Sequence, residues 1–246
     1  MLVFASRNDC HDGLRTQSSE LGGGSGGSSG RSSSTGAKAM FAFSSSAAPS
    51  LGTFLSRCPQ LSNVNLSRSP DLFSTVGLRK LLLGLNGVAL PGLRKLDLAG
   101  CDVQPEAAQL LGRLLARCHN LDELHLRGNA ALFTPEGLNN LDAGLGSYGL
   151  AMLERLYIGE CNIQVAAAPS LGAILGRCAQ LKGLSLSQNR GLLTPLGIDA
   201  LHSGLNGASL PSLQELALYR CNVRTPESKD RVRELLGAPQ HCAIRA

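Results

Sequence analysis

Cysteine is the residue type in this chain with the greatest chemical potential. Residues 153–163 read LERLYIGECNI and bring Tyr157, Glu160 and Cys161 close together on a segment with strand character. A thiolate next to a suitable base is the nucleophile of many covalent enzymes. Such chemistry requires the base to hold a fixed place relative to the cysteine, so the spacing of these residue types along the chain tests the idea.

The spacing argues against a reactive thiol. Six of the eight cysteines recur every 60 residues at two positions, Cys58, Cys118 and Cys178 at one and Cys101, Cys161 and Cys221 at the other. No histidine follows this period, no CxxC pair occurs, and the adjacent Cys118 and His119 are too close for ordinary double ligation of zinc. Free cysteine is among the most buried residue types. We therefore predict buried structural thiols, no catalytic residue, no metal site and no cofactor.

The cysteines belong to a repeat that covers most of the chain. Six segments fit the template leucine-x-x-leucine-x-leucine, with spacings that alternate between 32 and 28 residues, starting at Leu61, Leu93, Leu121, Leu153, Leu181 and Leu213. Each segment is short enough for one strand. A strand and a helix recurring at such a period indicate a solenoid.

The stretches between these segments carry helix signals. TPEGLNNLDAGL (134–145) and TPLGIDALHSGL (194–205) each begin with a threonine N-cap followed by proline at the first helical position. QPEAAQLLGRLLARC (104–118) and QVAAAPSLGAILGRC (164–178) occupy the same place in the other type of unit. Strand, helix and strand therefore alternate, which predicts a parallel sheet.

These repeats resemble the leucine-rich repeat family, and their alternating pattern is similar to its ribonuclease-inhibitor-like subclass, over roughly residues 47–240. The resemblance implies an α/β horseshoe, with parallel strands on the concave face and helices on the convex face. It also implies that Asn129 and Asn189, which stand where other repeats carry cysteine, point inward and bind backbone groups of the turns.

In such a fold the concave strand positions are the candidate binding surface. Neighbouring strands there carry opposite charges, which predicts ion pairs between Arg94 and Asp122, Lys95 and Glu123, Glu123 and Arg155, and Glu154 and Lys182. This interleaving of signs, without interleaved aromatic residues, argues against nucleic-acid binding. The partner-binding candidates are Tyr157, Tyr219, His125, Arg155, Arg127 and Arg220.

The two ends of the chain differ from its centre. Residues 1–46 include a Gly/Ser-rich stretch, and we expect a disordered tail there and a repeat domain of about six repeats over residues 47–246. Residues 47–61 closely match 167–181, which indicates that they form the helix of a repeat unit. The strand of that unit would lie near Ser33, where the sequence has no leucine pattern. We expect a fragment of a longer array, or an N-terminal end that is capped by a partner or self-associates.

The bulk composition limits the class of protein. The 246 residues are 43% hydrophobic, carry a net charge of +5 and contain no apolar run long enough to cross a membrane. The start of the chain lacks the long apolar region of a secretory signal, and we expect a cytoplasmic protein without membrane contact.

The expected function is a non-enzymatic scaffold that binds a protein partner of unknown identity. Two alternatives stay open because the same repeat subclass serves them: a regulator of a small GTPase resembling Ran GTPase-activating proteins, and a fragment of a NOD-like receptor-type sensor. No GxxxxGK[ST] motif occurs in the sequence, which excludes a complete receptor of the latter kind.

Overall fold

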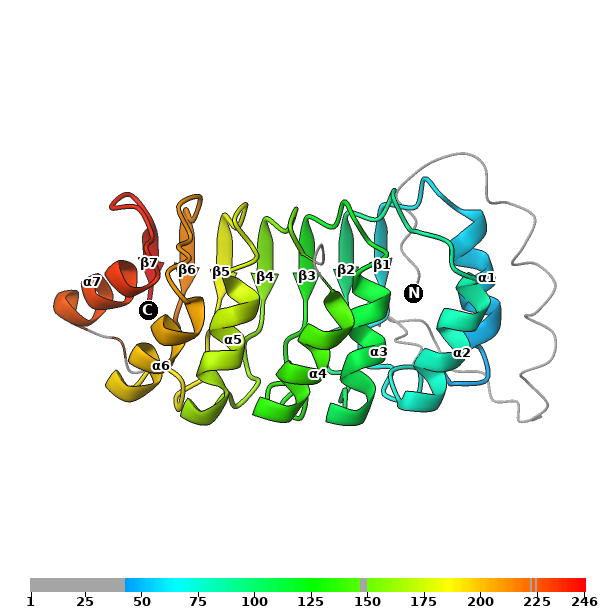
Figure 1. The fold of residues 1–246 in the computed structure, drawn as a ribbon, viewed down its shortest axis with the longest axis horizontal. Helices are drawn as coiled ribbons and strands as arrows, with labels where there is room; N and C mark the ends of the chain where they lie inside the picture. The colour runs from blue at the N-terminus through cyan, green and yellow to red at the C-terminus, as the bar shows by residue number, and fades with distance from the viewer. Residues whose placement is uncertain (1–42, 147–149, 222, 224) are drawn as a thin grey trace, which may run out of the picture.

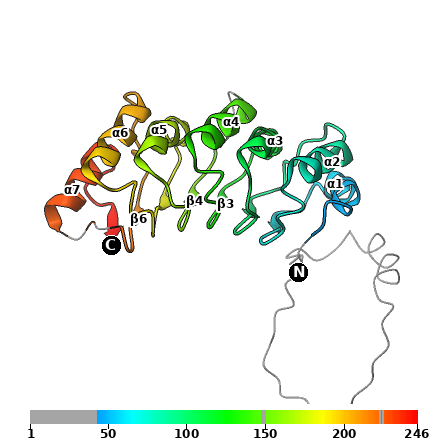
Figure 2. The ribbon, with the colours of Figure 1, turned by 90° about the horizontal axis from the view of Figure 1, so that it is seen from below.

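The computed structural model describes residues 43–146, 150–221, 223 and 225–246. Helices and strands alternate along this part of the chain and form a single row (Figure 1), which is curved when seen from below (Figure 2). The expected α/β solenoid with parallel strands is confirmed. The strands are β1 (Asn63–Asn65), β2 (Lys95–Asp97), β3 (Glu123–His125), β4 (Arg155–Tyr157), β5 (Gly183–Ser185), β6 (Glu215–Ala217) and β7 (Ala243–Arg245). The helices are α1 (Ala48–Arg57), α2 (Thr75–Leu85), α3 (Pro105–Leu115), α4 (Pro135–Leu145), η1 (Val165–Ala167), α5 (Ala168–Leu175), α6 (Pro195–Leu205) and α7 (Pro226–Leu235).

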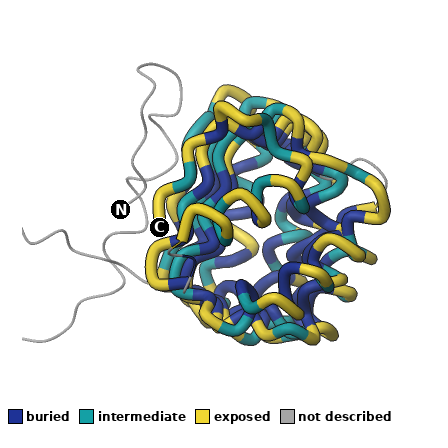
Figure 3. Tube along the Cα trace, turned by 90° about the vertical axis from the view of Figure 1, so that its left-hand side faces the viewer, coloured by how far each residue is buried: buried dark blue, intermediate teal, exposed yellow. Residues whose placement is uncertain are grey.

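The strands pair in the order in which they occur in the sequence, and every described pairing is parallel. Helices cover one side of the row and strands line the other (Figure 2). The central residue of each strand from β1 to β6 is buried, whereas its two neighbours face the concave side. The core is therefore a stack of leucine layers between the sheet and the helices (Figure 3).

The helices begin where their caps allow. The Thr134 and Thr194 side chains accept hydrogen bonds from the backbone N–H groups of Gly137 and Gly197, which confirms the predicted starts of α4 and α6. α5 departs from its counterpart α3 because its first turn is the 3-10 helix η1. Pro169 has no N–H to donate back along an α-helical turn, so the regular helix starts later there.

Helices pack in pairs rather than evenly. Gly112 of α3 and Gly144 of α4 meet backbone to backbone, because a Cβ built on Gly112 would lie 2.7 Å from the Gly144 Cα. The same close approach joins Gly52 to Gly84 and Gly172 to Gly204. The close helix pairs are therefore α1–α2, α3–α4 and α5–α6 (Figure 2). Each pair belongs to two consecutive repeats, and the pairs recur with the 60-residue period of the sequence.

Buried polar groups hold the turns that follow the strands. The Asn189 side chain donates to the Ile158 and Leu186 carbonyls and accepts from the N–H groups of Cys161 and Ile163. Asn129 makes the corresponding bonds to Leu98, Leu126 and Val103, which fulfils the expectation drawn from the family. Both side chains are fully buried.

The strand template finds β1 to β6 but not β7. β7 lacks the leucine pattern and pairs with β6 by placing Ile244 beside Leu216. At the other end, the expected tail lies outside the described residues up to residue 42, as does the missing strand expected near Ser33. Among the described residues no helix has the length and apolar character needed to span a membrane.

Candidate functional site

Two columns of side chains run across the concave face. In register, the first column is Asn63, Lys95, Glu123, Arg155, Gly183, Glu215 and Ala243, and the second is Asn65, Asp97, His125, Tyr157, Ser185, Ala217 and Arg245. The buried leucines between the columns fix the register, so these side chains are positioned by the core beneath them.

Four side chains at the middle of this face form one connected cluster. The Lys95 Nζ lies 2.5 Å from Glu123 Oε1, and His125 Nε2 lies 2.6 Å from the same oxygen. The His125 ring stacks on Tyr157, with centroids 4.3 Å apart and planes inclined by 22°. We call these four residues the Lys95–Tyr157 cluster. It links β2, β3 and β4 and restricts the Tyr157 ring before any partner arrives.

Electrostatics favour the charged form of Glu123 within the cluster. Partial burial acts to raise its pKa, but the hydrogen bonds and charges of Lys95 and His125 outweigh burial and lower the pKa below its ordinary value. Because the Nε2 atom of His125 faces this carboxylate, Nδ1 is the ring nitrogen left for other contacts.

On the strands that follow Tyr157, β5 and β6, several side chains of the concave face are small. Gly183 stands beside Arg155, Ser185 stands beside Tyr157, and Ala217 follows Ser185 on β6. Arg155 is exposed, and no ion pair with it is found among the described residues. An aromatic ring and an unpaired guanidinium therefore border a floor of small residues.

The other three candidates lie on the turns that follow the strands. Arg127 forms an ion pair with Glu160, and Gln188 donates to the same carboxylate. The Arg127 hydrogen bond, with a further contribution from the nearby charge of Arg220, lowers the pKa of Glu160. Tyr219 is 49% exposed. The candidates thus divide into a strand group (His125, Arg155 and Tyr157) and a turn group (Arg127, Tyr219 and Arg220).

The third residue after each strand from β1 to β6, the position of Arg220, has a left-handed backbone conformation. Arg68, Glu160, Gln188 and Arg220 have φ angles of 56°, 57°, 65° and 60°, and the equivalent residues after β2 and β3 are Gly100 and Gly128. A side chain in this left-handed region costs about 1–2 kcal/mol relative to glycine. Four non-glycine residues at a position with such a cost mark this edge as a candidate for function.

Three of the four ion pairs expected from the sequence are present. Arg94 lies 3.3 Å from Asp122, Lys95 lies 2.5 Å from Glu123, and Lys182 lies 2.6 Å from Glu154. The expected pair of Glu123 with Arg155 is wrong for the described residues. These two residues face each other in the register, but the Glu123 carboxylate turns towards Lys95 and His125 instead.

The sequence also left several contacts undetected. The Arg127–Glu160 pair joins diagonal rather than directly opposite positions, and no pairing rule from the template points to it. The shared place of His125 and Tyr157 in one column could be read from the repeat, whereas the stacking of their rings depends on rotamers that the repeat does not encode.

The described cysteines lie in the core and not on the concave surface. The seven described cysteines are free and buried. Burial raises the pKa of Cys161 to about 11 and that of Cys178 to about 12, which opposes thiolate formation. The Cys161 Sγ donates to the Leu126 carbonyl of the preceding repeat at 3.4 Å. Among the described residues no three His, Cys, Asp or Glu side chains gather as a metal ion would require.

Known proteins share this repeat. No protein-family model matches the chain. The chain is 33% identical to mouse ribonuclease inhibitor over 141 residues, which covers 56% of this chain and 29% of that protein. It is 31% identical to human NACHT, LRR and PYD domains-containing protein 12 over 183 residues, which covers 69% of this chain and 17% of that protein. The match therefore spans less than a third of the length of either relative.

Solved structures are also similar, at low scores. The yeast Rad7–Elc1 complex contains a chain with a TM-score of 0.32 and 16% identity, with coverage of 82% of this chain and 66% of that one. The TLR13–ssRNA13 complex has the same TM-score and 20% identity, with coverage of 67% and 27%. We draw no conclusion about this chain from likenesses at that level.

The fold and the site define a class, that of solenoid proteins with a concave parallel sheet and a convex helical layer. Within that class, the chain is a leucine-rich repeat protein with repeats of the ribonuclease-inhibitor-like type.

Proposed function

We propose that this chain is a non-enzymatic scaffold that binds a protein partner through the concave face of its solenoid. The observation that carries the proposal is the preordered Lys95–Tyr157 cluster beside the open floor of Gly183, Ser185 and Ala217. Tyrosine is enriched at interface hot spots, and a side chain that is ordered before association loses less entropy on binding.

The charges around the cluster support a protein ligand rather than a nucleic acid. Most basic side chains of the strand face are paired with acids, as Arg94 is with Asp122 and Lys182 is with Glu154. A nucleic-acid surface would need unpaired cations along a path with aromatic residues between them. Arg155 is instead a single cation next to Tyr157, which suits one carboxylate of a protein partner.

A cytoplasmic location is part of the proposal. The buried free thiols of the repeat, such as Cys101, Cys161 and Cys221, fit a reducing compartment.

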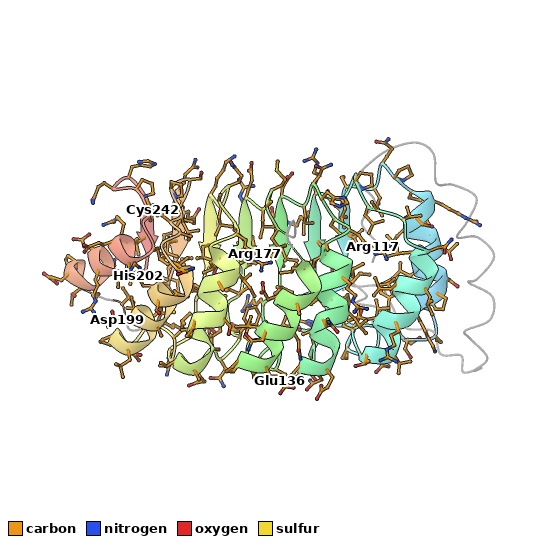
Figure 4. All side chains as sticks on the ribbon, in the orientation of Figure 1. Arg117, Glu136, Arg177, Asp199, His202 and Cys242 are labelled. Atoms are coloured by element: carbon orange, nitrogen blue, oxygen red, sulfur yellow. The ribbon has the colours of Figure 1, made fainter. Side chains whose placement is uncertain are left out.

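The test is affinity capture with the full chain as bait, followed by measurement of the affinity of each captured protein. Replacement of a hot-spot tyrosine by alanine costs about 2 kcal/mol or more, or roughly thirtyfold in Kd. We expect Tyr157→Ala to weaken the main partner by that factor, and Tyr219→Ala to weaken it less because Tyr219 lies on the turn edge. Glu136→Gln on the convex side is the matched control (Figure 4). Equal affinity of all variants for every partner contradicts the proposal.

A second candidate function is the ligand-sensing repeat array of a receptor. It is favoured by the 31% identity to human NACHT, LRR and PYD domains-containing protein 12, whose name places such repeats beside other domains. This candidate uses the same concave face. Detection of the sequence within a longer transcript that encodes a nucleotide-binding domain would support it over a separate scaffold.

A further inference from the structure

The positive charge of the repeats is concentrated near their N-terminal end. Residues 43–96 contain six Lys or Arg residues and one Asp, whereas residues 97–246 contain thirteen Lys or Arg and fourteen Asp or Glu. Neither α1 nor α2 contains an acidic residue. An asymmetry of this kind points to a partner of opposite charge at the basic end.

An exposed stripe of apolar and basic side chains runs along α2. Val76 is 56% exposed and Leu83 is 77% exposed, and they stand seven residues apart on the same side of the helix. Arg79 and Lys80 lie between them on that side. No hydrogen bond or ion pair of Arg79 or Lys80 is found within the described part of the chain.

The internal repeat shows that the fold does not require this stripe. The counterparts of Val76, Arg79 and Leu83 are Glu136, Asn139 and Ala143 in α4, and Leu196, Asp199 and Ser203 in α6. Glu136 and Asp199 lie on the outer helical layer, as Figure 4 shows. The combination of an apolar residue at both ends with cations between them occurs in α2 and not in α4 or α6.

The junction of each even helix with the next odd helix is tied by polar contacts elsewhere in the molecule. Ser170 of α5 donates to Asn139 of α4 at 2.8 Å, and Arg177 lies 2.9 Å from Asp142. Arg231 of α7 likewise lies 2.8 Å from Asp199 of α6. These contacts use the outward polar groups of α4 and α6 within the protein itself.

The α2–α3 junction lacks these ties. The counterparts of Asn139 and Ser170 are Arg79 and Leu110, and the counterpart of Asp142 is Leu82. Leu82 and Leu110 are only partly buried. Arg117, the counterpart of Arg177, donates instead to the Val88 carbonyl at 3.3 Å. At the α2–α3 junction, apolar and cationic side chains therefore stand where the other junctions have polar side chains that bind each other.

We propose that the outer surface of α2 and α3 is a second docking site, separate from the concave face, for an amphipathic helix with acidic flanks from another protein. We define this basic α2–α3 surface by Val76, Arg79, Lys80, Leu83, Leu110 and Arg113. The apolar members supply the contact area, and the unpaired cations select carboxylates and exclude basic partners.

A membrane surface fits these residues less well. Recognition of anionic lipid typically takes a cluster of about four to eight Lys or Arg residues. The basic α2–α3 surface has three, and Glu106 lies one turn before Leu110 on the same side of α3. Charge of this size suits a few carboxylates in fixed places on a helix.

The experiment uses the full chain and three labelled 18-residue helical peptides with the same leucine stripe, flanked by Glu, Gln or Lys. Fluorescence anisotropy at low and high salt gives each Kd. We expect the Glu peptide to bind at least tenfold more tightly than the Lys peptide. Leu83→Ser should weaken the Glu peptide at least tenfold, and the double replacement Arg79→Asn with Lys80→Asn should do the same and reduce the salt dependence.

Two control variants distinguish binding at the basic α2–α3 surface from binding elsewhere on the chain. Leu196→Ser removes an equally exposed apolar side chain from α6 and should leave binding unchanged, as should Tyr157→Ala on the concave face. Circular dichroism checks that each variant is folded. Equal binding of the Glu and Lys peptides, or wild-type affinity of the Leu83→Ser variant, overturns the proposal. So does Leu83-dependent binding to phosphatidylserine vesicles in preference to the peptide, or Leu83-dependent self-association in analytical ultracentrifugation.

Discussion

At the scale of single residues, two side-chain types solve the same problem in alternate repeats. The turn after each strand leaves backbone groups that must be paired once they are buried. Asn189 pairs four of them, two as donor and two as acceptor. Cys161 instead fills the space and makes weak Sγ–H contacts with the Leu126 and Gly159 carbonyls. Asparagine therefore carries more of the stability of the turns than cysteine does.

This difference predicts unequal effects of two alanine replacements. Asn189→Ala leaves buried backbone N–H and carbonyl groups without hydrogen-bond partners. We therefore expect the free energy of unfolding to fall by about 2–3 kcal/mol. Cys221→Ala removes one weakly bonded group from the neighbouring repeat and should cost about 1 kcal/mol. Urea denaturation followed by circular dichroism measures both. Equal losses would show that the asparagine bonds add nothing beyond packing.

The raised thiol pKa values predict slow chemistry in the folded protein. With the pKa of Cys101 and Cys161 raised to about 11, roughly one thiol in a thousand is ionised at pH 8. Because the folded-state pKa lies above the ordinary value, the protonated thiols favour folding at neutral pH, and this contribution declines as the pH rises through about 9–11. Disulfide-exchange reagents should label these sites only after unfolding in guanidinium. Rapid labelling of the native chain at either site would contradict this.

At the scale of elements, a pair of glycines sets how closely α3 and α4 approach each other. Gly144 lies in the last turn of α4, and within a helix alanine is normally more stable than glycine by up to about 1 kcal/mol. A Cβ at this position would lie 2.9 Å from the Gly112 Cα, so α3 and α4 would have to separate. The requirement for close approach thus outweighs helix propensity.

We expect Gly144→Ala to lower the free energy of unfolding by about 1–3 kcal/mol, because overpacking costs more than the helix gains. Ser203→Ala, at an exposed position of α6, is the control and should be neutral or slightly stabilising. Thermal unfolding of the two variants measures the difference. Stabilisation by Gly144→Ala would show that the helices can separate at little cost.

Elements differ in how well the sequence predicts them. β1 to β6 are predictable because each buries leucines at fixed spacing, and α4 and α6 are predictable from Thr134 and Thr194. β7 is not, because its pairing with β6 depends on an existing edge rather than on its own pattern. Side-chain geometry is also not encoded in the period: Glu123 faces both Lys95 and Arg155, and only the structure distinguishes them.

At the scale of the whole molecule, each layer of the solenoid contacts mainly the layers before and after it. The free energy of unfolding is then close to a sum of contributions from each repeat and from each interface between repeats. The position of a destabilising substitution therefore decides which repeats lose stability. Leu156 lies in β4, at the centre of the row, and is 3% exposed. Ile244 lies in β7, at one end, and is only partly buried.

Two alanine replacements test this one-dimensional behaviour. Leu156→Ala leaves a cavity between two interfaces, and we expect a loss of about 2–5 kcal/mol together with faster amide exchange on both sides of β4. Ile244→Ala removes a side chain with a single neighbouring strand, and we expect a smaller loss with faster exchange confined to α7 and β7. Hydrogen exchange read by mass spectrometry resolves the two patterns. Exchange that rises uniformly along the chain in both variants would mean that the repeats unfold as one cooperative body, and the position of the lesion would then have no influence on where protection is lost.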